Sequence, residues 1–323
     1  MPTDSWSATL ARLRTSPVPP AAPPPTLHEL RRAFSPSGSH LPVPDDVDVS
    51  EVSAGGVAAR WFRSPGADTA HAVLFLHGGG YCLGSTRSHG ELIARVARAS
   101  GIQVLALDYR LAPEHPFPAA VDDVRAAWLW LRHQQELPAR SCAVVGDSAG
   151  GGLALSLLVT VGEADEDQPG AVALLSPWTD LTLSGESVTA RAEDDPLLTP
   201  GLLAHLAGDY LAGADARSPL ASPLFADLTG FPPLLVQVGT AEILLSDSER
   251  LARSAARAGV EVTLQVEDGA PHVYQSMHEV NRARESTDKI GAFLRHHLVD
   301  TTTSADSPSF PPNASHPTAR TQS

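Results

Sequence analysis

The residues with the clearest potential for chemistry are a serine and its flanking glycines, in the segment Gly146-Asp147-Ser148-Ala149-Gly150. An apolar run at 143–145 precedes this segment, and a stretch of small residues typical of a helix follows it at 151–161. A sharp turn between a strand and a helix strains the serine backbone and needs glycine on both sides, because a Cβ atom there would clash across the turn. The pattern therefore predicts that Ser148 is a nucleophile at the tip of a strand.

A serine hydroxyl becomes an effective nucleophile only when a base removes its proton. Of the 13 histidines, His272 is the best placed, because it follows a predicted strand at 262–266 and precedes the last predicted helix. Other histidines, His77 and His89 among them, are more simply interpreted as loop or helix-surface residues. We therefore expect His272 to be the general base for Ser148.

A carboxylate must orient this histidine, and two candidates follow a predicted strand at 234–238. Glu242 lies in the loop directly beyond that strand. Asp247 follows Ser246, which forms a capping-box pattern with a glutamate three residues later and predicts a helix over 247–258. An acid in the first turn of a helix is favoured by the helix dipole, so Asp247 already has a structural explanation. We favour Glu242 as the orienting acid and keep Asp247 as the alternative.

Ester or amide cleavage also needs hydrogen-bond donors for the negatively charged oxygen that forms. The segment His77-Gly78-Gly79-Gly80 follows a predicted strand at 73–76, and its glycines can turn backbone amides toward the serine. A glycine loop can also cradle phosphate, but no Gly-Lys-Ser/Thr sequence follows this one. We therefore predict an oxyanion hole formed by the backbone N–H groups of Gly78, Gly79, Gly80 and Ala149.

The elements that position these residues are short apolar runs alternating with longer helical patterns, as in strands joined by crossover helices. Eight strands are predicted, over residues 47–52, 58–62, 73–76, 104–107, 143–145, 171–175, 234–238 and 262–266. The first two alternate in polarity like a hairpin, whereas the other six are continuous apolar runs that suit strands buried on both faces. About sixty residues separate the sixth strand from the seventh, which predicts an inserted lid or cap.

The two ends of the chain differ from the middle in composition. Residues 17–25 are rich in proline and predict a polyproline-like linker, with one short helix before it at 6–14 and another after it at 26–34. Residues 301–323 offer too little apolar surface to repay ordering and are predicted to form a disordered tail.

Composition disfavours several classes of function. The 37 acidic and 23 basic side chains give a net charge of -14, which disfavours binding to nucleic acid or to an anionic membrane. Cys82 and Cys142 cannot build a disulfide framework and fit a reducing compartment, and no zinc-type spacing of ligands predicts a metal site. No apolar stretch suits a signal peptide or a membrane span, so we expect a cytoplasmic protein.

Taken together, the motifs resemble the bacterial hormone-sensitive-lipase-like family of α/β-hydrolases over about residues 45–298. The resemblance rests on His77-Gly78-Gly79-Gly80, on Asp108-Tyr109-Arg110-Leu111-Ala112-Pro113-Glu114 followed by Pro116-Phe117-Pro118-Ala119-Ala120, on Gly146-Asp147-Ser148-Ala149-Gly150-Gly151, and on Ser176-Pro177-Trp178-Thr179-Asp180-Leu181. It implies an α/β-hydrolase fold, with an eight-stranded, mostly parallel sheet flanked by helices and covered by a helical cap. The implied divisions are an N-terminal cap segment at 1–44, a catalytic domain at 45–299 with a cap insertion at about 185–215, and a tail at 300–323.

The resemblance also implies a function, that of a serine carboxylesterase that hydrolyses small, short-chain acyl esters through an acyl-enzyme and without a cofactor. Glu242 aligns with the aspartate of an Asp-Pro-Leu motif that most members use as the triad acid, while Arg110 and Glu114 resemble structural residues. Related enzymes can form homodimers through an edge strand, and the sequence leaves the oligomeric state open.

Two alternatives stay open. The same serine could cleave an acetyl amide or a lactone, as an N- or O-deacetylase or a lactone hydrolase of secondary metabolism does. The fold could also serve as a non-catalytic ligand receptor, although relatives of that kind have lost the histidine that is present here as His272. Candidates for the pocket lining are Trp6, Phe34, Trp178, Tyr210 and Leu211.

Overall fold

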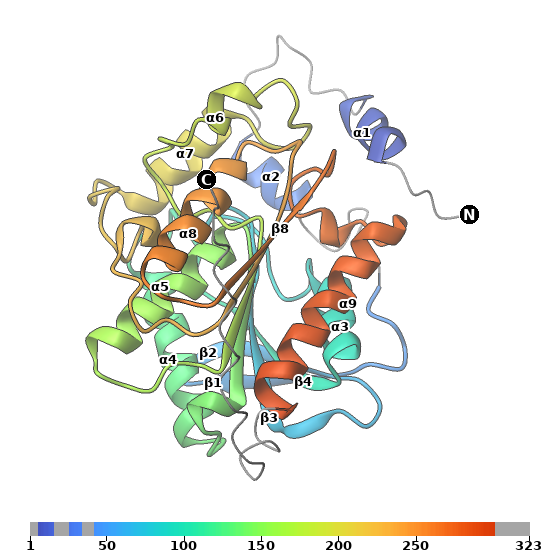
Figure 1. Ribbon diagram of the computed structural model, residues 1–323, viewed down its shortest axis with the longest axis vertical. Coiled ribbons are helices and arrows are strands. Elements are labelled where there is room, and N and C mark those ends of the chain that lie inside the picture. Colours follow the sequence, from blue (N-terminus) through green and yellow to red (C-terminus); the bar gives the residue numbers. More distant parts are fainter. Residues whose placement is uncertain (1–5, 16–25, 34–41, 301–323) are drawn as a thin grey trace, which may run out of the picture.

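The computed structural model describes residues 6–15, 26–33 and 42–300, and within them eight strands form one sheet in the order β1-β2-β4-β3-β5-β6-β7-β8 (Figure 1). The strands are β1 (Asp48–Ala54), β2 (Val57–Arg63), β3 (Asp68–Leu76), β4 (Ile102–Asp108), β5 (Cys142–Asp147), β6 (Ala171–Leu175), β7 (Leu234–Gly239) and β8 (Val262–Glu267). β2 runs antiparallel to both of its neighbours, and the other pairs are parallel. Each predicted strand corresponds to one of these, so the predicted α/β-hydrolase architecture is confirmed.

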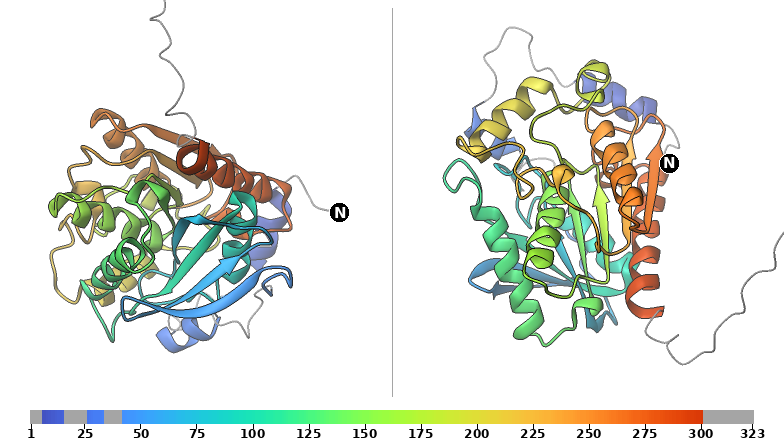
Figure 2. Two further views of the ribbon diagram at one scale, coloured as in Figure 1. Left: turned by 90° about the horizontal axis from the view of Figure 1, so that it is seen from below. Right: turned by 60° about the vertical axis from the view of Figure 1, so that its left-hand side comes forward.

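Helices cover both faces of the sheet and also its carboxyl edge. α3 and α9 lie on one face and α4, α5 and α8 on the other, while α2, α6 and α7 gather beyond the carboxyl ends of the parallel strands (Figures 1 and 2). The helices are α1 (Trp6–Thr15), α2 (Leu27–Ala33), α3 (Gly90–Ser100), α4 (Ala119–His133), α5 (Ala149–Glu163), α6 (Ser187–Ala190), α7 (Pro200–Leu211), α8 (Leu245–Arg257) and α9 (Asn281–Arg295). Short 3-10 turns, η1 (Ala139–Ser141), η2 (Pro223–Phe225) and η3 (Tyr274–Ser276), and a π-helical turn, η4 (His296–Asp300), complete the described elements.

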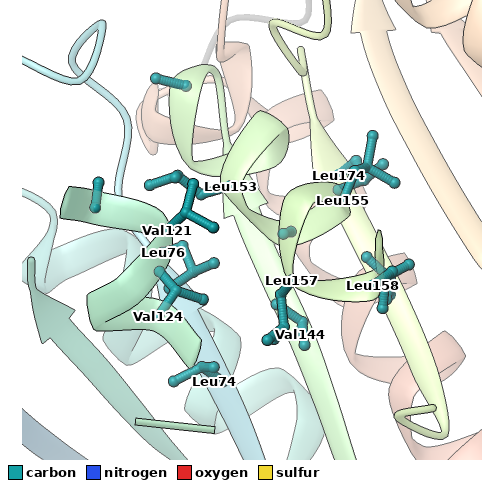
Figure 3. Close-up of a cluster of buried hydrophobic side chains, with 14 of the residues drawn as sticks. Leu74, Leu76, Val121, Val124, Val144, Leu153, Leu155, Leu157, Leu158 and Leu174 are labelled. Carbon is teal, nitrogen blue, oxygen red and sulfur yellow. The ribbon is translucent and has the colours of Figure 1, made fainter. Parts of the chain in front are cut away.

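The core consists of two apolar layers, one on each face of the sheet. Figure 3 shows part of the larger layer, where leucine and valine side chains of α4 and α5 pack against β3, β5 and β6. α5 is apolar around nearly its whole circumference, which suits a helix buried on almost all sides. α4 buries an apolar stripe at helical spacing, formed by Val121, Val124, Trp128 and Leu131.

Two local expectations are wrong. β8 is not buried on both faces, because it is the last strand of the sheet and leaves the side chains of Leu264 and Val266 36% and 44% exposed. The predicted capping box is also absent, because α8 begins at Leu245 and places Ser246 inside the helix. The hydroxyl of Ser246 instead accepts a hydrogen bond from the backbone N–H of Ser187, which belongs to α6 (2.8 Å). The Ser246 hydroxyl therefore makes a tertiary hydrogen bond instead of the helix-capping bond that the local pattern predicted.

The predicted insertion contains helices, since α6 and α7 both lie within residues 185–215. The two predicted N-terminal helices correspond to α1 and α2. The proline-rich linker at 17–25 and the tail at 301–323 lie outside the described residues, so the predicted division of the chain into segments stays a prediction.

Candidate active site

Ser148 occupies a strained turn between β5 and α5, as its flanking glycines predict. Its backbone has φ 53° and ψ −120°, a conformation that non-glycine residues adopt only when their surroundings enforce it. A Cβ on Gly146 would lie 2.2 Å from the carbonyl oxygen of Gly150, and one on Gly150 would lie 2.0 Å from the carbonyl oxygen of Leu76. Both glycines are therefore required by close backbone contacts, and together they fix the direction of the serine hydroxyl.

His272 reaches this hydroxyl from the loop after β8. Its Nε2 lies 2.9 Å from Ser148 Oγ, a hydrogen-bonding distance across 124 positions of sequence. Both side chains are largely buried, with 8% of Ser148 and 6% of His272 exposed. The parallel sheet brings them together because the loops after its strands meet at one edge. A base thus lies within proton-transfer distance of the predicted nucleophile.

Glu242 completes the chain of hydrogen bonds. Its Oε2 lies 2.7 Å from His272 Nδ1, and its Oε1 accepts hydrogen bonds from the Gly239 N–H and the Ser176 hydroxyl, each at 2.7 Å. Burial by itself would lower the pKa of His272, but the charge of Glu242 and its hydrogen bond outweigh this effect and raise it. The fully buried carboxylate can therefore orient the imidazole and stabilise its protonated form.

Asp247, the alternative acid, does not reach His272. Its Oδ2 accepts hydrogen bonds from the backbone N–H groups of Thr179 (2.8 Å) and Asp180 (2.9 Å), in the loop after β6. Burial raises its pKa to about 7. The structure thus brings Ser148, His272 and Glu242 together and leaves Asp247 to brace a neighbouring loop.

The predicted oxyanion hole needs one correction, because the N–H of Gly78 is already donated to Asp147 Oδ1 (3.0 Å). No described residue accepts a hydrogen bond from the N–H groups of Gly79, Gly80 or Ala149, and the first two line the same cavity as Ser148. Ala149 is the first residue of α5, where backbone amides have no partner within the helix. Three of the four predicted donors are therefore free to bind an oxyanion.

A cavity of about 870 Å³ opens above Ser148 and His272. Much of its apolar lining comes from the loop before α7 and from α7 itself, through Leu197, Leu198, Leu202, Leu203 and Leu206. These residues were missed by sequence reasoning, although leucines at 202, 203 and 206 recur at helical spacing. Of the described lining candidates, Trp178 lines the cavity, whereas Trp6, Tyr210 and Leu211 do not, and Phe34 lies outside the described residues.

Three further groups near the site carry no clear signal in the sequence. Asp195 is buried close to His272 and accepts a hydrogen bond from the Ile243 N–H (2.9 Å), and burial raises the pKa of its carboxyl group. His77 and His89 are also enclosed rather than on the surface, which corrects the expectation for both. His89 lines the cavity together with Asp147.

The described residues contain no group of three or more His, Cys, Asp or Glu side chains able to hold a metal ion. Among the same residues, none of the helices has the length and apolar character needed to cross a membrane.

Comparison with known proteins agrees with the geometry. Residues 73–276 match a family described by its α/β hydrolase fold. The chain is 44% identical over 245 residues to an acetyl-hydrolase of Streptomyces hygroscopicus, covering 76% of this chain and 81% of that protein. It is 34% identical over 287 residues to an ethyl acetate hydrolase of Pseudomonas putida, covering 84% and 90% of the two chains.

Solved structures give the same result. A crystal structure of an esterase from the bacterial hormone-sensitive lipase family superposes with a TM-score of 0.85 at 41% identity, covering 91% of this chain and 99% of that one. A hormone-sensitive lipase from a metagenome library superposes with a TM-score of 0.87 at 36% identity, covering 91% and 98%. The chain therefore belongs to the α/β-hydrolase fold family and, within it, to the bacterial hormone-sensitive-lipase-like esterases.

Proposed function

We propose that the protein is a serine carboxylesterase that hydrolyses short-chain acyl esters by a two-step acyl transfer. The single observation that carries the proposal is the continuous hydrogen-bonded chain from Ser148 through His272 to Glu242 at the floor of the cavity. The names of the relatives, which include an esterase and an ethyl acetate hydrolase, support an ester as the substrate.

In the first step, Ser148 Oγ attacks the ester carbonyl carbon while His272 Nε2 takes the hydroxyl proton. Glu242 stabilises the resulting imidazolium through its hydrogen bond to Nδ1. The carbonyl oxygen becomes negatively charged and accepts hydrogen bonds from the free amides of the glycine loop and of Ala149. The imidazolium then protonates the departing alcohol, which leaves an acyl group on Ser148.

In the second step, water replaces the alcohol. His272 Nε2 takes a proton from the water, whose oxygen attacks the acyl carbon within the same set of amide donors. Collapse of the tetrahedral intermediate returns the proton to Ser148 Oγ and releases the carboxylic acid. The same base and the same oxyanion site thus serve both steps.

The proposal is tested by Ser148→Ala with p-nitrophenyl butyrate as substrate and a fluorophosphonate as covalent probe. We expect turnover to vanish and labelling to be lost, because the variant lacks the only atom that forms the acyl bond. Ser248→Ala is a matched control, since the buried hydroxyl of Ser248 has no hydrogen-bond partner among the described residues. Retained turnover in Ser148→Ala contradicts the proposal, and a folded but unlabelled wild-type protein favours the non-catalytic receptor.

An acetyl-hydrolase is the second candidate, because a relative with 44% identity bears that name. Cleavage of an acetyl ester or acetyl amide uses the same nucleophile, base and donors, so the catalytic geometry fits both substrates. A panel of p-nitrophenyl esters of increasing acyl length, N-acetylated amines and lactones separates the candidates. A preference for acetyl groups on amines over butyryl esters favours the second candidate.

The proposal also includes the oligomeric state of the protein and its cellular compartment. β8 lies at the edge of the sheet and exposes Leu264 and Val266, which suits a homodimer formed through this edge. Cys82 and Cys142 are buried free thiols, which suits a reducing cytoplasm. Sedimentation of the wild-type protein and of Val266→Glu tests the dimer, because a charge at this edge would weaken association.

A further inference from the structure

A second histidine–carboxylate pair, His89 and Asp147, lies beside the glycine loop. We propose that His89 is a positioning residue for the oxyanion hole: as an imidazolium it holds Asp147 against the Gly78 amide and thereby fixes the direction of the Gly79 N–H. The inference rests on the proposed function, because an oxyanion forms only if Ser148 attacks a carbonyl group. His89 acts through its neighbours and takes no part in bond making.

The surroundings of His89 suit its doubly protonated form. Nδ1 lies 3.3 Å from the Ser85 carbonyl oxygen and 2.9 Å from Ser88 Oγ. The Ser88 hydroxyl also lies 2.9 Å from the Ser85 carbonyl oxygen, and when it donates its hydrogen there it accepts from the imidazole. Nε2 lies 3.4 Å from Asp147 Oδ2, which is another acceptor. Both ring nitrogens therefore have an acceptor within reach, the Ser85 carbonyl oxygen at Nδ1 and the Asp147 carboxylate at Nε2, and an imidazolium can donate to both.

Asp147 connects His89 to the glycine loop. One oxygen of its buried carboxylate faces His89 and the other accepts the Gly78 N–H. A Cβ on Gly78 would lie 2.3 Å from Asp147 Oδ2, so the loop and the carboxylate are in direct contact. A buried carboxylate is costly without a counter-charge. Burial acting alone would raise the pKa of Asp147, but the neighbouring His89 charge lowers it overall.

Hydrogen bonds fix two successive peptide units of the loop. The Tyr109 hydroxyl donates to the carbonyl oxygen of His77 (2.6 Å), and Asp147 holds the N–H of the same peptide unit. In the next unit, His77 Nδ1 donates to the carbonyl oxygen of Gly78 (2.8 Å). Because N–H and C=O point in opposite directions across a trans peptide bond, the N–H of Gly79 points away from His77. This amide remains without an acceptor among the described residues and is available to the oxyanion.

The adjacent histidine cannot replace His89. The rings of His77 and His89 stack with centroids 5.4 Å apart, and His77 Nε2 is buried without a hydrogen-bond partner among the described residues. Burial first, and then the charge of His89, lower the pKa of His77 to about 4, so it stays neutral. The charged and titratable groups that face His89 are Asp147, His77 and, farther off, Asp108. Of these two stacked histidines, only His89 has a pKa raised above its ordinary value.

The test compares His89→Gln with the wild-type enzyme. Loss of a whole oxyanion donor lowers kcat by about 10²- to 10³-fold, so a displaced donor should lower kcat by about 10- to 100-fold. KM for p-nitrophenyl butyrate should change less than about twofold, because the donor acts on the transition state. The inhibition constant of a trifluoromethyl ketone, which forms an oxyanion on the serine, should rise by the factor by which kcat/KM falls.

His71→Gln is the matched control. His71 pairs with Asp68 (2.7 Å), and its side chain is as enclosed as that of His89, with 13% and 12% exposed respectively. It lies on β3 and does not line the cavity. We expect wild-type kcat and inhibitor affinity in this variant. If His89 had a merely structural role, His89→Gln would lower thermal stability without a selective loss of inhibitor affinity.

The pH dependence adds an independent readout. Burial alone would lower the pKa of His89, but the charge and hydrogen bond of Asp147 raise it. The positioning charge is therefore present below this raised pKa and is lost as pH rises through it, so wild-type kcat should fall on the alkaline side. His89→Gln should lack that alkaline fall.

Asp147→Asn supplies a second variant in case His89→Gln does not fold. It keeps an oxygen for the Gly78 N–H but removes the charge, so it too should lose the alkaline fall. The double variant should lose no more kcat than the worse single variant, because both changes break one unit. Wild-type kcat, pH profile and inhibitor affinity in His89→Gln overturn the inference. Fluorophosphonate labelling of wild-type Ser148 tests the proposed function separately, so the two failures are distinguishable.

Discussion

Replacing Glu242 by glutamine gives the sharpest test of the catalytic chain, because all partners of this carboxylate are donors. Oε1 receives the Gly239 N–H and the Ser176 hydroxyl, while Oε2 receives His272 Nδ1–H. Glutamine has one oxygen and one NH₂ group. If its oxygen replaces Oε1, the NH₂ group faces His272, and Nδ1 must become an acceptor. The imidazole then carries its proton on Nε2 and cannot take the proton of Ser148.

The size of the effect follows from this choice of orientation. Reversing the glutamine would leave the buried Gly239 N–H facing the NH₂ group, at a cost of about 1 to 3 kcal/mol. The orientation that traps the wrong tautomer should therefore predominate. In a serine protease, changing the triad acid to its amide lowers kcat by about 10⁴-fold, equivalent to about 5 kcal/mol of transition-state stabilisation. We expect a loss of this order for Glu242→Gln, with KM little changed.

The assay is kcat for p-nitrophenyl butyrate, normalised by fluorophosphonate titration of active sites, with circular dichroism to verify folding. Asp247→Asn is the matched control. Because burial raises the pKa of Asp247 to about 7, its neutral form is already populated near neutral pH, and asparagine resembles that form. We expect its kcat to stay within about threefold of wild type. A larger loss in folded Asp247→Asn than in Glu242→Gln refutes the reasoning.

Two further predictions concern pH and the turn. Activity should rise with pH as His272 loses its proton, because only the neutral imidazole can accept the Ser148 proton. Glu242 raises the pKa of His272, so this rise should lie above the ordinary histidine range. A pH–rate profile of kcat/KM checks the prediction, and a rise below the ordinary histidine range contradicts it. Gly150→Ala should destabilise the fold by about 1 to 3 kcal/mol and abolish most activity, because its Cβ would lie 2.0 Å from the backbone oxygen of Leu76. Urea unfolding measures the change against Gly201→Ala, whose Cβ would meet nothing within 4 Å and which should be at least as stable as wild type.

Much of the site could be predicted from the sequence, because local backbone geometry fixes the positions of its residues. The nucleophile turn demands glycine at 146 and 150 for steric reasons that act within a few residues, so the motif alone locates Ser148. The position of His272 followed from the strand before it, since a parallel sheet collects such loops at one edge. Eight continuous or alternating apolar runs likewise predicted eight strands, because hydrophobic periodicity depends mainly on which faces are buried.

Tertiary structure decided what local patterns leave open. Glu242 and Asp247 lie five positions apart, and in the folded chain Glu242 meets His272 while Asp247, in the first turn of α8, binds the loop after β6. The loss of Gly78 as an oxyanion donor, and the enclosure of His89, depend on contacts with Asp147 across long stretches of sequence. Such contacts depend on how folded elements pack together, and a single sequence carries no local periodicity or spacing that encodes them. The sequence by itself therefore determined the fold, indicated the proposed nucleophile and base and favoured Glu242 as the acid, whereas packing brought Glu242 and not Asp247 to His272 and decided which amides remain free.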